Sequence, residues 1–297
     1  MFRPVFSERD PDSAMSRFLP ALIVAIGLAF SSGSTTGRVP ESVSNAPSAT
    51  ELTLPRTDGD ELPAPPPALT PVEQLRLFAE GQRACQGPCV TPFGAVLGVA
   101  DGVEGRSNCV STCIRPERSF LDLQTGEVAV HQGQPDAARF QYIGVTYQCV
   151  EYVRKWWMKN RHLTFGDVDS AYNILYLTEG SDIRTHETIP LARSLNGTAR
   201  RPPQRGDLLV YAADRADPEW RHGHVAVVVA VDLERGQVAL AEENYDNRPW
   251  QQPQGFARQI QLFEVGGRYT LLDVPMTTQR NEEGGRITGW IYPLIAP

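Results

Sequence analysis

The sequence predicts an α+β fold in which one helix packs against an antiparallel sheet. Three observations indicate it. Val150, Val153 and Trp157 recur at the spacing of an amphipathic helix. Residues 225–231 form a β-branched run that ends at an aspartate, as buried strands do, and residues 238–241 form a second apolar run after a short polar turn. The strands that we expect are Asp207–Ala212, Val225–Val231 and Val238–Glu242.

The composition is that of a globular protein. The chain has 297 residues, of which 41% are hydrophobic, and its 28 Lys and Arg against 35 Asp and Glu give a formal net charge of −7. At about 150 residues per domain this length predicts one or two domains, and the apolar fraction is enough to fill a core. A mildly acidic chain without a Lys/Arg run lacks the electrostatic footprint of phosphate-backbone binding. We therefore expect no nucleic acid partner.

An apolar run near the N-terminus predicts export. Residues 18–30 (FLPALIVAIGLAF) are followed by small residues, as at a signal cleavage site. At about 1.5 Å per helical residue the run is about 20 Å long, which is short of the ~30 Å hydrocarbon core of a membrane. Residues 1–34 are therefore expected to be a signal peptide, with an uncleaved N-terminal anchor, and hence a membrane tether, as the alternative. Either interpretation places the rest of the chain in the periplasm or outside the cell.

A proline-rich stretch separates this run from the folded part. Residues 35–71 contain many prolines with Ser and Thr and few large apolar residues, a composition typical of disordered linkers. Thr70, Pro71 and Glu73 then match the N-cap, the first-turn proline and the capping box of a helix. We expect this short helix to carry Val72, Leu75 and Phe78 on its apolar side. The folded domain is expected to span residues 72–297.

The chain has five cysteines: Cys85, Cys89, Cys109, Cys113 and Cys149. The first four form two C-x-x-x-C pairs in a Cys-rich segment, residues 85–113, and the fifth stands apart. In an exported chain this pattern favours two disulfides within the Cys-rich segment, with three connectivities possible, and a free Cys149. The rival interpretation is a structural zinc site with four thiolate ligands.

Cys149 is a candidate nucleophile. It stands at the start of the predicted helix, where unpaired amide groups and the helix dipole stabilise a thiolate. A thiolate nucleophile needs a histidine, and His224 directly precedes the strand 225–231. The following hairpin returns Glu242 or Asn244 to the same edge of the sheet, where either can orient the imidazole. Taken singly, these residues also fit an inert core cysteine, a strand-end histidine and a solvated acid.

Four segments resemble the cysteine, histidine-dependent amidohydrolase/peptidase (CHAP) family, and within it the amidase domains of the glutathionylspermidine synthetase/amidase type. They are 147–154 (YQCVEYVR), 205–210 (RGDLLV), 223–228 (GHVAVV) and 241–244 (AEEN), and the resemblance extends over residues 91–297. It implies a papain-like fold. Cys149 would be the nucleophile, His224 the base and acid, and Glu242 the residue that orients His224, supported by Asn244. The Cys149 amide and the Gln148 side chain would form the oxyanion site.

The resemblance also implies a reaction, an acyl transfer through a thioester that needs no metal ion or organic cofactor. Arg154 stands at a basic position of the family motif that could bind a substrate carboxylate, although a salt bridge on the helix surface fits equally well. Trp220 and Trp250 lie in polar loops and are candidates for the wall of a cleft. Export favours a peptidoglycan or other peptide amide as substrate. The alternatives are a glutathionylspermidine-type amide and a non-catalytic binding module with the same fold.

Overall fold

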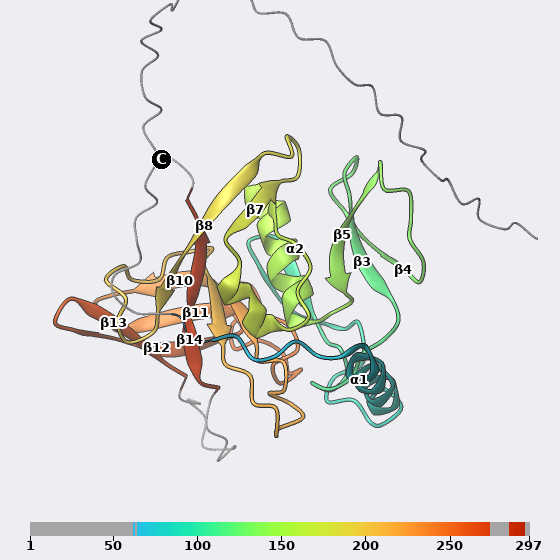
Figure 1. Cartoon of the computed structure of the whole chain (residues 1–297), viewed down its shortest axis with the longest axis horizontal. Helices are drawn as coiled ribbons and strands as arrows, with labels where there is room; N and C mark the ends of the chain where they lie inside the picture. Colours follow the sequence, from blue (N-terminus) through green and yellow to red (C-terminus); the bar gives the residue numbers. More distant parts are fainter. Residues whose placement is uncertain (1–61, 63, 274–284, 295–297) are drawn as a thin grey trace, which may run out of the picture. The chain divides into compact units, whose positions relative to one another are not determined.

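A computed structural model describes residues 62, 64–273 and 285–294 (Figure 1). Contacts divide the chain into Met1–Leu52 and Thr53–Pro297, and every described residue belongs to the second unit. The predicted signal or anchor, residues 1–34, and most of the predicted linker, residues 35–71, therefore lie outside the described residues. Among the helices that the structure describes, none is both long and apolar enough to cross a membrane.

The main element is a large antiparallel sheet. Within the described ranges nine strands form it in the order β13-β12-β11-β10-β9-β14-β8-β7-β6. Their bounds are β6 Leu163–Thr164, β7 Glu179–Asp182, β8 Thr188–Leu195, β9 Leu208–Tyr211, β10 Val225–Asp232, β11 Gln237–Ala241, β12 Arg258–Val265, β13 Arg268–Leu272 and β14 Ile287–Pro293. The three strands expected from the sequence are β9, β10 and β11, and their ends differ by one residue at most.

Two smaller sheets and the helices complete the fold, which is α+β as predicted. One small sheet pairs β1 with β2 and the other has the order β4-β3-β5. The bounds are α1 Pro71–Ala84, β1 Val96–Ala100, β2 Val103–Arg106, β3 Arg118–Asp122, β4 Val128–His131, β5 Phe140–Val145, α2 Cys149–Arg161 and a 3₁₀ helix at Ala171–Tyr176.

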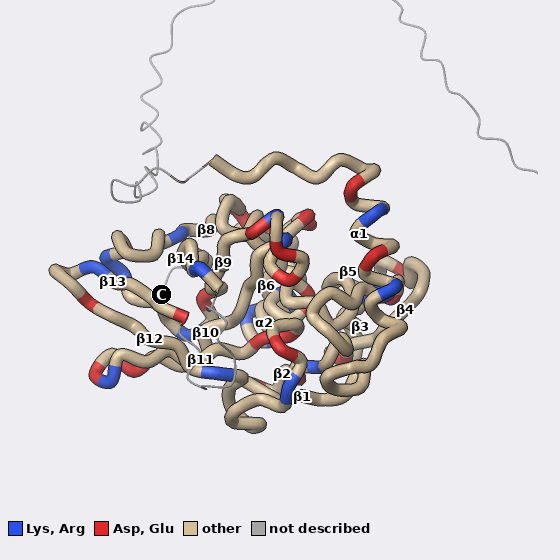
Figure 2. Tube along the Cα trace, turned by 90° about the horizontal axis from the view of Figure 1, so that it is seen from below, with Lys and Arg blue, Asp and Glu red and all other residues tan. Residues whose placement is uncertain are grey.

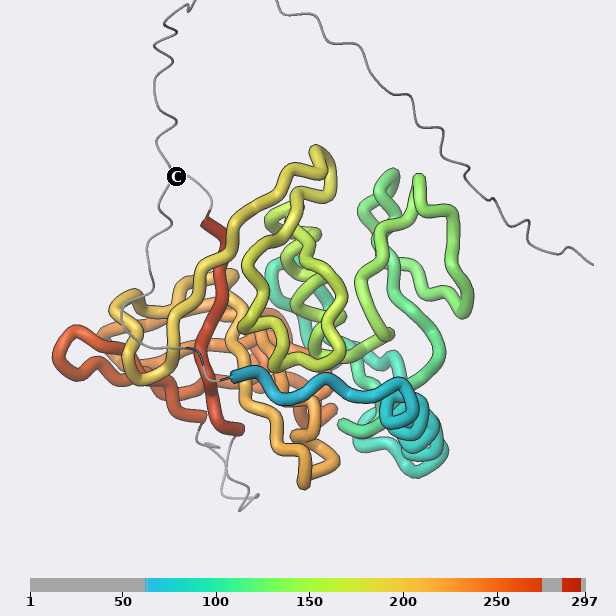
Figure 3. Tube along the Cα trace, viewed as in Figure 1, coloured from blue at the N-terminus to red at the C-terminus, as the bar shows by residue number. Residues whose placement is uncertain are grey.

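Helix α2 lies between the large sheet and β5, where it contacts β10 and β5 (Figures 1 and 3). Its apolar side chains share a core cluster with alternate residues of β10. The members include Tyr152, Val153, Trp156, Trp157, Val225, Val227 and Val229. A second cluster, with Ala226, Val228, Leu240 and Tyr211, contains no α2 residue, so it covers the other face of the sheet. Strand β10 is buried on both faces, which explains its unbroken apolar run.

Helix α1 begins as the sequence predicts but turns a different face inward. The Thr70 side chain accepts a hydrogen bond from the Glu73 amide at 3.3 Å, and Glu73 accepts one from the Thr70 amide at 2.8 Å. Val72 and Leu75, expected on the buried side, are 76% and 71% exposed, whereas Leu77 and Gly81 are buried. The expected face is therefore wrong at Val72 and Leu75, whereas Phe78 is half-buried.

The reason is the contact between α1 and the Cys-rich segment. A Cβ atom at Gly81 would lie 2.7 Å from Ile114, so the helix approaches the segment through a glycine. The Ile114 amide donates to the Gly81 carbonyl at 3.2 Å, and one turn later Cys85 is bonded to Cys113. These links fix the rotation of α1. Helix α1 also carries charges of both signs (Figure 2), among them the pair Arg76 and Glu80 at 3.1 Å.

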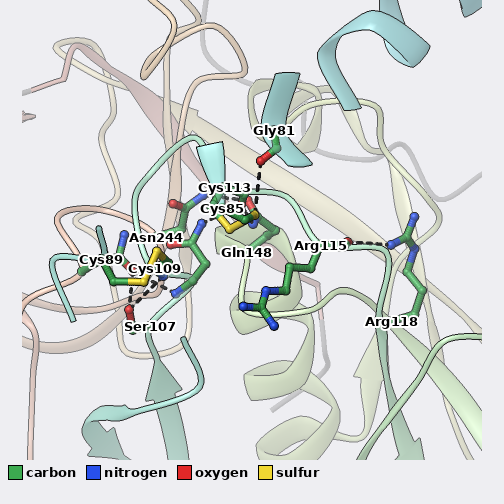
Figure 4. Close-up of a disulfide and its surroundings, with 12 residues drawn as sticks. Gly81, Cys85, Cys89, Ser107, Cys109, Cys113, Arg115, Arg118, Gln148 and Asn244 are labelled. Carbon is green, nitrogen blue, oxygen red and sulfur yellow. Dashed lines mark hydrogen bonds between the residues drawn. A yellow bond between two sulfur atoms is a disulfide. The ribbon is translucent and has the colours of Figure 1, made fainter. Parts of the chain in front are cut away.

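The Cys-rich segment is closed by two disulfides, as predicted. Cys85 is bonded to Cys113 and Cys89 to Cys109, so the two bridges are nested, and Cys149 is free (Figure 4). The alternative of a four-thiolate zinc site is wrong, because each of its four sulfurs is bonded to another sulfur.

Candidate active site

Three of the predicted residues meet at the start of α2. Cys149 is the first residue of α2, and His224 directly precedes β10. The Cys149 thiol lies close enough to the His224 imidazole to help raise the pKa of the ring. Nε2 of that ring lies 2.7 Å from Oε2 of Glu242. The three residues are 8%, 4% and 3% exposed, so the contacts are shielded from bulk water.

The strand register explains why His224 and Glu242 meet. In the β10–β11 hairpin Val227 pairs with Ala241, so the same register sets Ala226 opposite Glu242. Alternate residues of a strand share a face, and His224 is two residues from Ala226. The two side chains are therefore diagonal neighbours at one end of the hairpin.

The backbone before α2 sets the position of the thiol. Tyr147 has a left-handed φ of 59°, which few residues other than glycine adopt without strain, and Gln148 is the extended N-cap. The side chain of Gln148 makes no cap hydrogen bond to the helix. The first-turn amides of α2, among them that of Cys149, therefore face the site and favour negative charge there.

Glu242 is held in its ionised form by Arg258, the first residue of β12. Nε of Arg258 lies 2.5 Å from Oε1 of Glu242, and the same guanidinium pairs with Asp273. Burial raises the pKa of Glu242, but the charge of Arg258 and the hydrogen bond to His224 outweigh it and lower the pKa to about 2. Glu242 is therefore a carboxylate at every pH of interest.

His224 is held in its protonated form. Burial lowers its pKa, but hydrogen bonds to Cys149 and Glu242, together with their charges, outweigh burial and raise the pKa from 6.5 to about 9. Because Nε2 is bonded to Glu242, Nδ1 is the ring nitrogen left for the thiol. The site thus holds a positively charged imidazolium beside the sulfur of Cys149, the arrangement that a cysteine nucleophile needs.

Aromatic rings surround the imidazole. The ring centroids of Tyr211 and Tyr245 each lie 5.5 Å from that of His224, and the centroid of Trp220 lies 6.4 Å away. Trp220, which the sequence suggested as part of a cleft wall, is half-buried and lies beside His224. The rings restrict the imidazole to one orientation.

The Gln148 side chain is fixed at both ends of its amide (Figure 4). Nε2 donates to the carbonyl of Cys113 at 2.9 Å, and Oε1 accepts from Nδ2 of Asn244 at 2.7 Å. One N–H of Nε2 is used in this way, and the second has no acceptor among the described residues, so it can donate to an oxyanion. Asn244 was expected to support the histidine, but it supports Gln148 instead.

Two predicted substrate-binding residues are in the interior. Arg154 is 2% exposed, and its guanidinium donates to the carbonyls of Ile143 and Gly166, the latter at 2.9 Å. This burial corrects the interpretation of Arg154 as a ligand of a substrate carboxylate, whereas the alternative of a salt bridge is found in part, because the guanidinium lies 3.5 Å from Oδ1 of the exposed Asp167. Trp250 is 5% exposed and fills the space beside Gly98 and Gly105, where an added Cβ would lie 2.4 Å and 2.3 Å from its ring. Trp250 is therefore a core residue and not a cleft wall.

Several residues around the site were not found from the sequence. Besides Arg258 and Tyr245, a buried cation lies on α2: Nζ of Lys155 is 3.1 Å from Oε2 of Glu151 and 3.0 Å from Oε1 of Glu243. Burial raises the pKa of Glu243 well above its usual value. The four-residue spacing of Glu151 and Lys155 is the available signal, but it is equally typical of an exposed helix pair.

Comparison with known proteins agrees with this geometry. Residues 140–244, from β5 to Asn244, match the CHAP domain. The bifunctional glutathionylspermidine synthetase/amidase of Escherichia coli (strain K12) is 30% identical over 182 residues, which are 61% of this chain and 27% of that protein. Trypanothione synthetase of Crithidia fasciculata is 27% identical over 187 residues, 63% of this chain and 25% of the relative. The chain thus spans about a quarter of the length of these relatives.

Proposed function

Residues 140–244 form a CHAP domain, and from this premise we propose that the protein is a cysteine amidohydrolase that cleaves an amide bond through a thioester acyl-enzyme. The observation that carries the proposal is the 2.7 Å contact between Nε2 of His224 and Oε2 of Glu242, beside the Cys149 thiol at the start of α2. This arrangement supplies a nucleophile, an acid and base, and a group that orients the base.

In the first half-reaction the Cys149 thiolate attacks the carbonyl carbon of the amide. A C–S bond forms, and the electron pair of the carbonyl moves to oxygen, where the Cys149 N–H and the free N–H of Gln148 stabilise it. The imidazolium of His224 then gives its proton to the leaving nitrogen. The C–N bond breaks, an amine departs, and the acyl group remains on sulfur.

In the second half-reaction water releases the acyl group. His224, now neutral, takes a proton from the water, which attacks the thioester carbonyl and expels the thiolate as a carboxylic acid forms. Glu242 keeps Nε2 of His224 protonated throughout, and Arg258 keeps Glu242 charged. These steps use only side chains of this chain and water.

The substrate that we propose is an amide in the peptides of peptidoglycan, reached after export. Two observations support this choice. The two disulfides are typical of proteins in an oxidising compartment outside the cytosol. Residues 1–34 have the composition of a signal peptide or an N-terminal anchor, so the enzyme is proposed to work in the periplasm or outside the cell, free or tethered to the membrane.

A second candidate substrate is a glutathionylspermidine-type amide. It is favoured by the relative from Escherichia coli, whose name includes a glutathionylspermidine amidase. The third candidate is a binding module that retains the fold without turnover. The first two candidates differ in the amide that Cys149 attacks, and in the third Cys149 attacks none. Experiments can therefore separate them.

The test uses the full chain and its Cys149→Ala variant on two substrates. Purified sacculi should release muropeptides with the wild type and not with Cys149→Ala. Intact sacculi together with hydrolysis of glutathionylspermidine would favour the second candidate. Inactivity on both, with slow alkylation of Cys149 by iodoacetamide at pH 6, would favour the binding module, because an activated thiol is alkylated fast.

A further inference from the structure

We propose that Arg115, with Phe93 and Tyr147, forms a subsite that binds a carboxylate of the substrate close to the amide that is cleaved. The inference rests on the proposed amidohydrolase function and adds a substrate class to it: amides whose peptide carries a free carboxylate near the scissile bond.

The first argument is the position of Arg115 along the nucleophile segment. The Cys113 carbonyl accepts from Nε2 of Gln148 at 2.9 Å, and the Glu117 carbonyl accepts from the Thr146 amide at 3.3 Å. The chain from 113 to 117 therefore runs along residues 146–148. Arg115 stands midway between these two contacts, beside the residues that immediately precede Cys149.

The second argument is the orientation of its side chain. The guanidinium carbon of Arg115 lies 3.8 Å from the ring centroid of Phe93, and that ring is 5.0 Å from the ring of Tyr147. Figure 4 shows the Arg115 side chain leaving the chain on the opposite side from Arg118. Stacking on an aromatic ring fixes the plane of a guanidinium and leaves its N–H edge available for a ligand.

The third argument is that this cation has no anionic partner. Among the described residues Arg115 forms no ion pair and its guanidinium donates no hydrogen bond to the protein. Its neighbours differ: Arg106 pairs with Glu104, and Arg118 donates to the carbonyls of residues 115–117. A half-buried guanidinium that is oriented but unpaired is suited to bind an anion from outside the chain.

The chemistry of a guanidinium selects the ligand. Its planar fork binds a carboxylate through two parallel N–H···O bonds, a geometry that an uncharged carboxamide cannot match. The substrates preferred by this subsite are therefore peptides with a free carboxylate near the scissile amide.

Binding to the full-length Cys149→Ala variant tests the proposal without turnover. The probes are a γ-glutamyl peptide amide with its α-carboxylate free and the same peptide with that group as a carboxamide. We expect the carboxylate peptide to bind roughly 10- to 100-fold more tightly, as for a hydrogen bond to a charged group. In Cys149→Ala/Arg115→Gln this preference should disappear, and Arg115→Lys should retain part of it.

Arg248→Gln is the matched control. Arg248 is an exposed arginine on the loop that follows Asn244, so the substitution removes the same charge near the site without touching the subsite. It should leave the preference unchanged. Equal binding of the two peptides to Cys149→Ala, or a preference that survives Arg115→Gln, would overturn the inference.

The failure of the subsite and that of the proposed function are distinguishable. Equal binding of the two peptides to Cys149→Ala, together with hydrolysis by the wild type, would refute the carboxylate subsite only. A preference that depends on Arg115, in a wild type that cleaves neither sacculi nor glutathionylspermidine, would retain the subsite and refute the hydrolase. Circular dichroism of each variant, together with Arg115→Lys as the conservative change, separates lost binding from lost folding.

Discussion

Asn244 donates its side-chain amide to Oε1 of Gln148 at 2.7 Å. The two residues come from different parts of the fold, since Asn244 follows β11 and Gln148 caps α2. Their bond ties the loop after the Glu242 strand to the residue next to the nucleophile. The other end of the Gln148 amide is held by the Cys113 carbonyl, so the proposed oxyanion donor is positioned by two segments distant in sequence.

Substitution of Asn244 should therefore affect the chemical step rather than binding. In Asn244→Ala the Gln148 amide loses one of its two anchors, and we expect kcat to fall by about 10- to 100-fold with little change in KM, as for a slightly misplaced group. Gln148→Ala should cost about 10²–10³ in kcat. Steady-state kinetics on the active substrate measure both. Asn160→Ala, an exposed change on α2, is the control. A rise in KM at unchanged kcat would contradict the assignment.

The charge of Glu242 should set the alkaline limit of activity. Its hydrogen bond and charge help to raise the pKa of His224 to about 9, so the active imidazolium persists at neutral pH and is lost as the pH rises through about 9. In Glu242→Gln one of the groups that raise this pKa is gone. The alkaline limb of the kcat/KM profile should therefore move to lower pH. The maximal kcat/KM should also fall by up to about 10⁴-fold, because the imidazole is no longer oriented.

The control for this pH profile is Glu234→Gln, which removes an exposed carboxylate from the turn between β10 and β11. Its alkaline limb should coincide with that of the wild type. If the alkaline limb of Glu242→Gln coincides with that of the wild type, a group other than Glu242 sets the alkaline limit of activity.

Local sequence patterns predict the elements that carry the chemistry. Helix α2 starts at Cys149, and β10 and β11 lie within one residue of their expected bounds, because apolar periodicity reports burial directly. The hairpin that joins these two strands then determines the proximity of His224 and Glu242. Helix, strand and turn signals therefore bring Glu242 or Asn244 near His224, whereas the pairing of His224 with Cys149 was expected from the chemistry of a thiolate and from the family resemblance.

The remaining features depend on packing between distant segments. Arg154 stands at a motif position that suggested a substrate ligand, but its guanidinium donates to the carbonyls of Ile143 and Gly166 in the interior. Arg258 begins a strand of mixed polarity, and only the pairing of β11 with β12 brings it to Glu242. The buried face of α1 depends on a glycine contact with Ile114. A single sequence contains no local signal for such long-range neighbours.

The disulfide between Cys85 and Cys113 should matter for catalysis as well as for stability. Loss of either bridge should lower the free energy of unfolding by about 3–4 kcal/mol, since the bridges close loops of 28 and 20 residues. Only the Cys85–Cys113 bridge holds the carbonyl that anchors Gln148. Cys85→Ala/Cys113→Ala should thus lower kcat by about tenfold or more, as for a displaced catalytic group.

Cys89→Ala/Cys109→Ala is the matched variant for that comparison, and it should unfold at lower denaturant concentration while retaining most of its kcat. Denaturant unfolding and kinetics at a temperature where both variants are folded separate the two effects. An equal loss of kcat in the two double variants would show that the bridges act through stability only.

Lys155 should be needed for folding because its ammonium group lies between two buried carboxyl groups. Glu151 and Glu243 have fully buried side chains, and both contact Nζ of Lys155. In Lys155→Met the two carboxyl groups lose their cation, and we expect the free energy of unfolding to fall by about 3–5 kcal/mol, as when one partner of a buried ion pair is removed. Adding Glu151→Gln and Glu243→Gln should restore part of the lost free energy of unfolding, because the uncompensated charge is then gone.

Lys159→Met, four residues further along α2 and exposed, is the control and should change stability by less than about 0.5 kcal/mol. Urea unfolding measures all three variants, and equal losses for the two lysines would contradict the role of the buried cation.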